Sequence, residues 1–384
     1  MDYLKITKDL ISLDTSVPPG SNYENAIDYL LPLFQDVGFK SQKIKIPDIE
    51  AEGRTGRFAL VAHRRNPGKT RLIFYSHIDV VPAEGWAAFQ PRVENGRLYG
   101  RGAADMKGGL VALLLGLDKI KDKTVNYDIS VMVTTDEEYS QASQLRYLAQ
   151  FLQPVSGANV FSLDSNFGFV SIANLGLLQM DVVVKGKSVH SGLAHLGVNA
   201  VEEAVSLMNA LLKLKNKVVQ RKSRVEVSSD TGLSYMEGRL NINMVRGGIK
   251  SNIVPDECLI TIDRRLIPEE NIAEAEEEIM YVLRSVPGVD WEIKKVLKIP
   301  TVPPSRGSIV DKLSGIIKGV TGKTGQYGEM GSGDLSAVVA LDWGGQDFGL
   351  GVIRTECNIH GKEEYVYIKD IEDVAEVISR FLTG

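Results

Sequence analysis

Two adjacent glutamates, Glu137 and Glu138, follow a strongly apolar run of the chain, and a His-x-Asp pair precedes them at His77 and Asp79. Neighbouring side chains leave the end of a strand in different directions, so adjacent carboxylates can take different roles. One can bind a metal ion while the other accepts a proton from a metal-bound water. A solvated acidic loop is the alternative, but the preceding run at 129–133 should be buried and bring the pair close to the core.

Three further residues, Asp105, Asp164 and His360, could complete a metal site with this set. Taken singly, each has an ordinary alternative: a helix cap for Asp105 and a surface position for the other two. Together with His77, they offer two imidazole nitrogens and at least four carboxylate oxygens, which suit a pair of zinc, manganese or cobalt ions. The absence of cysteine ligands from this set argues against a structural zinc.

Asp105 lies between a glycine-rich turn and an apolar stretch that predicts a largely buried helix at 106–121. The amino end of a helix favours negative charge, and a carboxylate there has two oxygens available to bridge two cations. A phosphate-binding loop is the rival interpretation of 100–109, but neither the Gly-x-Gly-x-x-Gly nor the Walker spacing is present. A metal-binding role is therefore favoured over a nucleotide site.

Strands and helices alternate around these residues. An amphipathic stretch at 23–38 predicts an opening helix, which Pro32 should kink or delimit. Apolar, β-rich runs predict strands at 71–76, 129–135 and 160–163. Strands separated by helices indicate an α/β fold with a mostly parallel sheet. Several candidate residues follow the ends of these strands, where open α/β sheets bind their ligands.

The pattern changes near residue 177. From there to about residue 296, strands and helices follow in the order βαββαβ, which predicts a small antiparallel, ferredoxin-like α+β domain with two helices on one face of its sheet. We therefore expect a catalytic domain formed by 1–177 and 297–384, with an inserted domain at 178–296. The inserted strands are expected at 178–185, 238–246, 256–264 and 290–296, the inserted helices at 198–214 and 269–285, and a closing helix at 369–382.

The composition is that of a soluble, two-domain protein: 384 residues, 43% hydrophobic and 24% charged. The net charge of −5 argues against nucleic-acid and polybasic membrane partners. No apolar run reaches the roughly 18 residues of a membrane span, and the first residues are too polar for a signal peptide. Cys258 and Cys357 are expected to be reduced and buried. These features predict a cytoplasmic protein.

Seven motifs occur in a fixed order: 77–79 (HID), 100–109 (GRGAADMKGG), 135–138 (TDEE), Asp164, 186–192 (GKSVHSG), 251–268 and His360. In order and spacing they resemble the co-catalytic dinuclear zinc exopeptidase and deacylase family, which includes acetylornithine deacetylase, succinyl-diaminopimelate desuccinylase, aminoacylase-1 and the glutamate carboxypeptidases. The similarity covers nearly the whole chain, including the inserted lid domain. It implies a zinc-exopeptidase-like catalytic domain and a lid that also serves dimerisation.

Carried over to the matching positions, the resemblance implies two divalent metal ions per subunit, zinc first and cobalt or manganese as alternatives. One ion is bound by His77 and Asp164, the other by Glu138 and His360, and Asp105 bridges them. Asp79 would orient His77, and Glu137 would be the general base. The resemblance also implies a cis peptide bond after Asp105.

Three residues of the inserted domain are ambiguous without the resemblance: His190, Asn252 and Arg265. His190 could be an ordinary loop histidine, and a strand-borne arginine more often packs and pairs than binds substrate. The resemblance implies that His190 stabilises the oxyanion in the active site of the partner subunit of a homodimer. It also implies that Asn252 and Arg265 contact the substrate, the arginine through a carboxylate.

The function expected from this resemblance is hydrolysis of the amide bond of a small N-acyl amino acid, of the deacetylase or desuccinylase type, through a metal-bridging water and Glu137 as general base. The alternatives are a carboxypeptidase or dipeptidase of the same family, and a non-catalytic binding module, against which the intact Glu137 speaks. Two departures leave the acyl group and the amino acid open: 139–143 replaces the glycines of many members, and 331–334 (GSGD) lacks the commonest threonine.

Overall fold

The computed structural model describes residues 1–139, 142–333, 336 and 343–384 of the chain. The chain divides into two compact units. The first unit comprises Met1–Ile172, Ser305–Tyr327 and Gly333–Gly384, and the second comprises Ala173–Pro304 and Gly328–Ser332. None of the helices in the described part of the chain has both the length and the apolarity needed to cross a membrane.

The second unit extends beyond the predicted 178–296 at both ends, and residues 328–332 also group with it, although the sequence predicts 297–384 as part of the first unit. Local contacts explain the difference. Gly328 forms a β-bridge with Val227 and packs closely against the Met236 side chain. The Arg265 guanidinium donates a hydrogen bond of 3.1 Å to the Ser332 hydroxyl.

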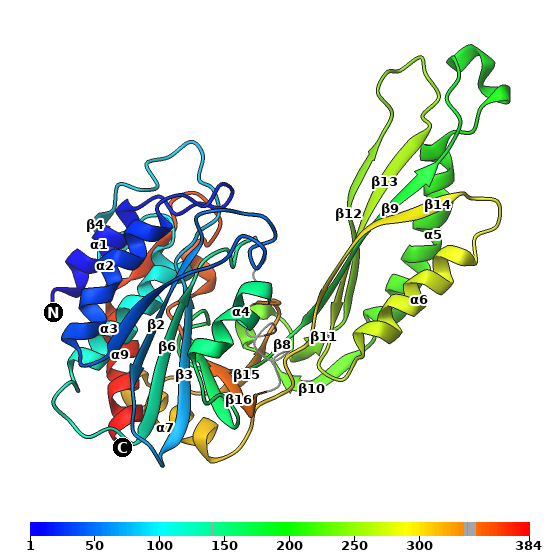
Figure 1. Cartoon of the computed structure of the whole chain (residues 1–384). Coiled ribbons are helices and arrows are strands. Elements are labelled where there is room, and N and C mark those ends of the chain that lie inside the picture. The colour runs from blue at the N-terminus through cyan, green and yellow to red at the C-terminus, as the bar shows by residue number, and fades with distance from the viewer. Residues whose placement is uncertain (140–141, 334–335, 337–342) are drawn as a thin grey trace. The chain divides into compact units, whose positions relative to one another are not determined.

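The main sheet of the first unit is mixed, with strand order β1-β2-β6-β3-β7-β16-β8-β15 (Figure 1). Its centre is parallel: β3 pairs in parallel with β6 and β7, and β16 with β7. Strand β2 pairs antiparallel with β1 and β6, and β8 pairs antiparallel with β16. The α/β class is confirmed. The strands are β1 (Lys40–Lys45), β2 (Phe58–Arg64), β3 (Thr70–His77), β6 (Tyr127–Thr134), β7 (Ala158–Ser162), β8 (Val170–Asn174), β15 (Gln326–Glu329) and β16 (Gly344–Gly349).

The burial of the central strands explains why the sequence pattern predicted them. Every residue of β6 and β7 is buried, as is every residue of β3 after Thr70. Parallel strands covered on both faces appear in a sequence as continuous apolar runs. Helices cover both faces: α2, α3 and α9 lie on one side of the sheet and α4 on the other (Figure 1).

Among the described residues, the helices of the first unit are α1 (Tyr3–Ser12), α2 (Tyr23–Asp36), α3 (Gly108–Asp118), α4 (Ala142–Leu148), α7 (Ser308–Thr321) and α9 (Ile368–Thr383). The stretch predicted as the opening helix is therefore the second one, because α1 precedes it. Pro32 lies inside α2, which continues to Asp36. The predicted closing helix is α9, whose buried stripe includes Ile371, Val374, Ile378 and Phe381.

A separate, small three-stranded sheet has the order β17-β5-β4. Its members are β4 (Arg92–Glu94), β5 (Arg97–Tyr99) and β17 (Tyr365–Tyr367). In the antiparallel pair of β5 and β17, Tyr99 lies opposite Tyr365. The pairing therefore brings the segment after residue 99 next to the segment before residue 365.

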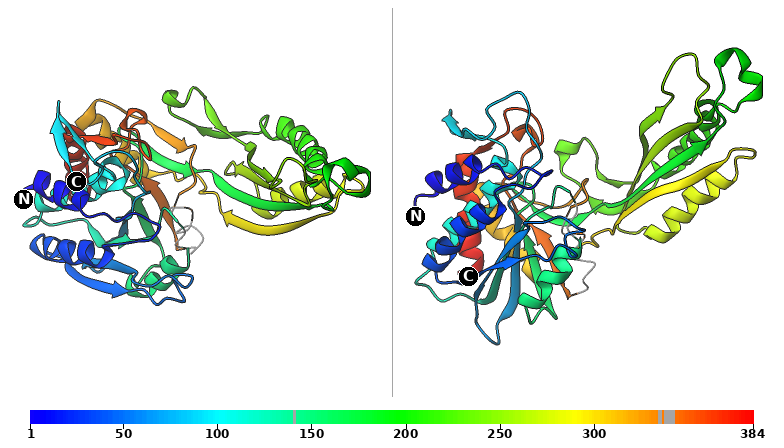
Figure 2. Two further views of the ribbon diagram at one scale, coloured as in Figure 1. Left: turned by 90° about the horizontal axis from the view of Figure 1, so that it is seen from above. Right: turned by 45° about the horizontal axis from the view of Figure 1, so that its top comes forward.

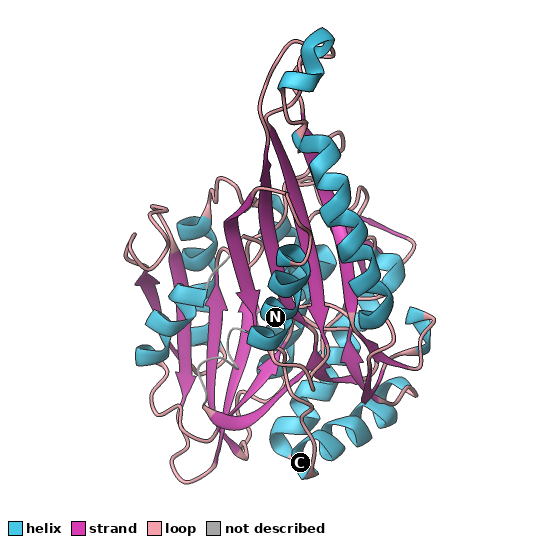
Figure 3. Cartoon of the chain, turned by 90° about the vertical axis from the view of Figure 1, so that its right-hand side faces the viewer, coloured by secondary structure: helices cyan, strands magenta, loops and turns pink. Residues whose placement is uncertain are grey.

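The second unit contains an antiparallel sheet of order β12-β13-β9-β14. Helices α5 and α6 pack on one face of it, around buried residues such as Val182, Leu207, Ile260 and Ile279 (Figure 2). Figure 3 shows a long helix running alongside long strands. The elements are β9 (Gly176–Lys185), α5 (Ala200–Val218), β10 (Lys222–Glu226), β11 (Tyr235–Glu237), β12 (Arg239–Gly247), β13 (Glu257–Leu266), α6 (Ile272–Arg284) and β14 (Trp291–Ile299).

Candidate metal centre

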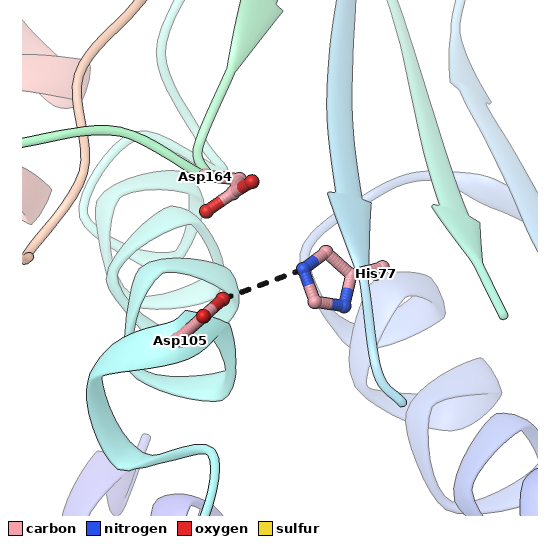
Figure 4. A group of neighbouring side chains, drawn as sticks. All are labelled: His77, Asp105 and Asp164. Carbon is pink, nitrogen blue, oxygen red and sulfur yellow. Dashed lines mark ion pairs between the residues drawn. The ribbon is translucent and has the colours of Figure 1, made fainter. Parts of the chain in front are cut away.

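Three candidate ligands, His77, Asp105 and Asp164, point toward one another at the carboxyl end of the main sheet (Figure 4). His77 ends β3, Asp164 follows β7 by two residues, and Asp105 lies in the turn before α3. One ligand atom of each lies within 4.8 Å of the others. His77 Nε2 is 3.6 Å from Asp105 Oδ1 and, although buried, has no hydrogen-bond partner among the described residues. Such a nitrogen is suited to a metal ion, because buried polar atoms are otherwise paired.

A second group consists of Asp105, Glu138 and His360, whose ligand atoms also lie within 4.8 Å of one another. His360 Nε2 is 3.0 Å from Asp105 Oδ2 and 3.3 Å from Glu138 Oε1. Asp105 belongs to both groups, with Oδ1 toward one histidine and Oδ2 toward the other. This placement allows one carboxylate to bridge two cations.

Asp79 contacts both groups. His77 Nδ1 is 3.1 Å from the Asp79 carbonyl oxygen and 3.4 Å from its Oδ1, and both residues are fully buried. Asp79 Oδ2 accepts a hydrogen bond of 2.9 Å from the Glu138 backbone N–H. Contacts on Nδ1 fix the orientation of the His77 ring and leave Nε2 directed at Asp105.

The chain around Asp105 departs from the continuous helix that was predicted over 106–121. Residues Ala103–Lys107 form a π-helical turn, and α3 begins only at Gly108. Asp105 itself has φ −117° and ψ 93°, which is outside the helical region. The peptide bond between Asp105 and Met106 is cis, as the family resemblance implied.

Sequence reasoning gave no role to Glu364, which is 1% exposed. Its carboxylate accepts hydrogen bonds from the backbone N–H groups of Gly102, Ala104 and Asp105 and from the Arg101 guanidinium. The only signal in the sequence is an acidic residue four positions after His360, and nothing local distinguishes it from its neighbour Glu363.

Asp136 has a role distinct from those of the two glutamates that follow it. It is fully buried, and its φ of +66° is unusual for a residue other than glycine. Its carboxylate accepts hydrogen bonds from Arg54 at 2.7 Å, Arg57 at 2.9 Å and Tyr23 at 2.9 Å. Asp136 therefore anchors the turn that carries Glu137 and Glu138.

Negative charge dominates the electrostatics of the site. Burial by itself would lower the pKa of His77, but the Asp105 and Asp79 carboxylates raise that pKa well above its usual value. Asp105 and Glu138 likewise raise the pKa of His360 to about 10. Burial would raise the pKa of Asp105, yet the two histidines hold it below its usual range. The site thus attracts positive charge, as a site for cations must.

Glu137 belongs to neither ligand group. Burial raises the pKa of this carboxyl well above its usual value; His77 opposes the shift, and the charges of Asp164 and Glu138 add to it. Each ligand group has three protein ligands, which is the number typical of catalytic rather than structural zinc sites. The carboxylate of Glu137 is not needed as a ligand in either group. The residues present fit two divalent cations of the zinc, cobalt or manganese type.

The remaining candidates, His190, Asn252 and Arg265, lie in the second unit. His190 is exposed, its Nδ1 accepts a hydrogen bond of 3.1 Å from Gly192 N–H, and it forms a β-bridge with Ile253, so it lies near Asn252. Arg265, on β13, donates two hydrogen bonds to the Asp263 carboxylate, at 3.0 and 3.2 Å.

The two departures from the family pattern fall partly outside the described residues. Tyr139 is exposed, and its ring centroid lies 4.6 Å from the Arg54 guanidinium carbon. Residues 140–141, which follow it, and Asp334, the last residue of the GSGD segment, are outside the part of the chain that the structure describes.

The paired ligand groups could hold metal ions, and the sequence matches Peptidase family M20/M25/M40 over residues 73–384. The chain belongs to this family, which confirms the resemblance, and it is a metal-dependent amidohydrolase. It is 26% identical over 399 aligned positions to the succinyl-diaminopimelate desuccinylase of Marinobacter nauticus, covering 99% of this chain and 97% of that protein.

Solved structures share the fold along the whole chain. An M20 family metallo-carboxypeptidase from Sulfolobus solfataricus superposes with a TM-score of 0.83 at 19% identity, covering 100% of this chain and 99% of the other. A dinuclear metal-binding M20 peptidase from Bacillus subtilis superposes with a TM-score of 0.68 at 13% identity, covering 99% and 96%. At these identities the likeness shows the fold alone.

Proposed function

We propose that this protein hydrolyses the amide bond of a small N-acyl amino acid, as a deacylase of the desuccinylase type. The observation that carries the proposal is the pair of ligand groups sharing Asp105, with the buried carboxyl of Glu137 beside them and in neither group. Full-length similarity to a desuccinylase supports this substrate class. A carboxypeptidase or dipeptidase is the second candidate, which the likeness to a metallo-carboxypeptidase fold leaves open.

In this proposal His77 and Asp164 would hold one ion, Glu138 and His360 would hold the other, and Asp105 would contribute a carboxylate oxygen to each. Zinc is the first choice, with cobalt or manganese as alternatives. When bound, the ions supply the positive charge that polarises the amide carbonyl and makes water nucleophilic at neutral pH. Asp79 keeps the His77 ring oriented through Nδ1.

Glu137 is the proton carrier. Because its carboxylate is not needed as a ligand, its oxygens can accept the proton of the attacking water and then deliver it to the nitrogen of the leaving amine. His190 would donate a hydrogen bond to the oxyanion that develops on the carbonyl oxygen, and that charge is absent from the ground state. Asn252 and Arg265 would hold the substrate, the arginine through a carboxylate.

Replacing Glu137 with glutamine tests the mechanism. Glu137→Gln should lower kcat by at least about 10²–10⁴-fold, because general acid–base catalysis contributes that much. Metal analysis should still find two ions per chain, because Glu137 is not a ligand in this scheme. Appreciable residual kcat in the variant would place the proton carrier elsewhere.

A substrate panel tests the class. It would hold N-succinyl-diaminopimelate, N-acetylornithine, simple N-acetyl amino acids and several dipeptides, with Glu137→Gln as control. Release of the free amine from an N-acyl compound supports the deacylase. Turnover of the dipeptides alone would favour the second candidate, and tight binding without any turnover would favour a binding module.

We also propose that the second unit forms a lid and a homodimer interface that brings His190 to the active site of the partner subunit. Strand β12 is at the edge of its sheet and exposes Met244 and Val245, and Ile249 beyond it is 92% exposed. An apolar sheet edge is open to pairing with a second copy. This arrangement makes dimerisation a condition for catalysis.

Light scattering after gel filtration, combined with kinetics, tests the dimer. Val245→Asp together with Ile249→Asp should give a monomer that retains its metal ions and loses most of its kcat. The matched control is Ile49→Asp, an isoleucine of the first unit that is 84% exposed, which should leave mass and rate unchanged. A fully active monomer would contradict the role of His190 in the partner site.

A further inference from the structure

Two loops that are far apart in the sequence carry the ligands Asp105 and His360. We call residues 100–105 the Asp105 loop and residues 358–364 the His360 loop. They leave paired strands, because β5 ends at Tyr99 and β17 begins opposite it at Tyr365. Gly100 N–H donates a hydrogen bond of 2.9 Å to the Glu364 carbonyl oxygen and extends this pairing by one step. Beyond that bond, other contacts have to hold the loops together.

The Glu364 side chain supplies those contacts. Its Oε1 accepts hydrogen bonds from the N–H groups of Ala104 at 3.0 Å and Asp105 at 3.1 Å. Its Oε2 accepts from Gly102 N–H at 3.0 Å and from Arg101 Nη1 at 2.7 Å. Glu364 is 1% exposed, so nearly all of its hydrogen-bonding capacity is spent on the Asp105 loop.

Arg101 completes the link from the other side. It is 2% exposed, and its Nη2 donates a hydrogen bond of 3.0 Å to the carbonyl oxygen of Gly361, the residue next to His360. The pair of Arg101 and Glu364 therefore bonds to the backbone of both loops. We call this pair the clamp.

The His360 loop needs such support because its backbone is strained. Asn358, His360 and Glu363 have φ values of 54°, 60° and 60°, in the left-handed region that residues other than glycine seldom adopt. Strained backbone persists only where surrounding contacts over-determine it. The Arg101 bond at Gly361 and the Glu364 carboxylate lie on the C-terminal side of the ligand histidine and hold this conformation.

We propose that Arg101 and Glu364 are positioning residues for the ion bound by Asp105, Glu138 and His360. The clamp fixes the 3.0 Å separation of Asp105 Oδ2 and His360 Nε2 before a metal ion arrives. The other group reaches Asp105 from the ends of β3 and β7, without the His360 loop. Loss of the clamp should therefore weaken the ion at His360 far more than the ion at His77. This inference rests on the metal ligands of the proposed function.

Stepwise metal binding to the metal-free full chain tests the clamp. Glu364→Gln keeps the size of the side chain but replaces one acceptor oxygen with a donor that faces N–H groups. Calorimetry with Zn²⁺ should show one step within about threefold of the wild type and a second step weakened by about 10–100-fold, which is the usual effect of losing a contact behind a ligand. The visible spectrum of Co²⁺ should show the same loss of the second ion.

Asp128→Asn is the matched control. Asp128 is also a buried carboxylate, 5% exposed, and accepts hydrogen bonds from Arg65 and Asn66. It lies at the amino end of β6, whereas Glu137 and Glu138 follow the carboxyl end of that strand. Both binding steps should match those of the wild type in this variant. Weakening of the second step to the same extent as in Glu364→Gln would show that any lost buried carboxylate has this effect, and would overturn the proposal.

Arg101→Lys keeps the positive charge but loses the paired hydrogen bonds to the Glu364 carboxylate and the Gly361 carbonyl oxygen. It is the variant to measure if Glu364→Gln does not fold. Its second binding step should also weaken by at least about tenfold. A folded clamp variant that binds both ions as tightly as the wild type would contradict the positioning role of Arg101 and Glu364. The proposed metal ligands would be unaffected by that result. A wild-type chain that binds fewer than two ions overturns the proposed centre itself, so the two failures are distinguishable.

Discussion

At the scale of single residues, three consecutive acids show how strongly the surroundings decide what a carboxylate does. Asp136 is enclosed by Arg54, Arg57 and Tyr23, so it serves as a structural anchor. Glu138 faces His360 at 3.3 Å and can bind a metal ion. Glu137, between them, has its pKa raised by burial and belongs to no ligand group. Chemically similar side chains are thus separated into an anchor, a candidate ligand and a candidate base.

Asp136→Asn isolates the anchor. Asparagine also tolerates a positive φ, so the change removes mainly the charge. It leaves two arginines without their buried partner, and breaking such a pair costs about 3–5 kcal/mol. The free energy of unfolding measured in urea should fall by that order, and kcat should fall because the turn carrying Glu137 loses its anchor. A change below about 1 kcal/mol would mean that the arginines find other partners.

At the scale of elements, helix α3 connects the metal centre to the core. It is apolar on all sides, and its glycines allow close packing of the backbone. A Cβ at Gly109 would lie 2.8 Å from the carbonyl oxygen of Leu163, which precedes Asp164. A Cβ at Gly116 would lie 2.9 Å from the carbonyl oxygen of Ala375 in α9. Gly109 thus faces the loop that carries the candidate ligand Asp164, whereas Gly116 faces helix α9.

Gly109→Ala and Gly116→Ala should therefore differ in their affinity for metal ions. Both overpack the interior at a cost of about 1–3 kcal/mol, of which alanine recovers up to about 1 kcal/mol as the better helix former. Gly109→Ala should also weaken metal binding, because the loop carrying Asp164 must move. Calorimetry with Zn²⁺ should show this loss in Gly109→Ala alone. Equal metal affinities in the two variants would show that the packing of α3 at Gly109 does not affect metal binding.

At the scale of the whole molecule, the two units should respond differently to metal removal. All five candidate ligands belong to the first unit. An ion at about 100 times its Kd stabilises the folded state by about 2.7 kcal/mol, because it binds only that state. A chelator should therefore speed amide hydrogen exchange at 100–105 and 358–364 and leave exchange in α5 and α6 unchanged. Faster exchange throughout both units would indicate that metal binding stabilises the chain as one body.

Much of the fold could be predicted because its elements have local patterns. The central strands β3 and β6 are continuous apolar runs, and α5 and α6 have buried residues at helical spacing. The three-residue strands β4, β5 and β17 were missed because a periodic pattern needs more residues than they have. The π-helical turn before α3 was missed because its departure from the helix is set by surroundings that Asp105 meets only in the folded chain.

The sequence by itself determined the kinds of candidate ligand, their order and the places of His77, Glu138 and Asp164 after the ends of strands, because residue type and short-range pattern are local properties. Only the tertiary structure decided that Asp105 lies between His77 and His360, since the second contact joins residues 255 positions apart. The same holds for Glu364, whose bond to Gly102 spans 262 positions. Which carboxylate can act as a ligand, an anchor or a clamp depends on partners that approach only when distant strands pair.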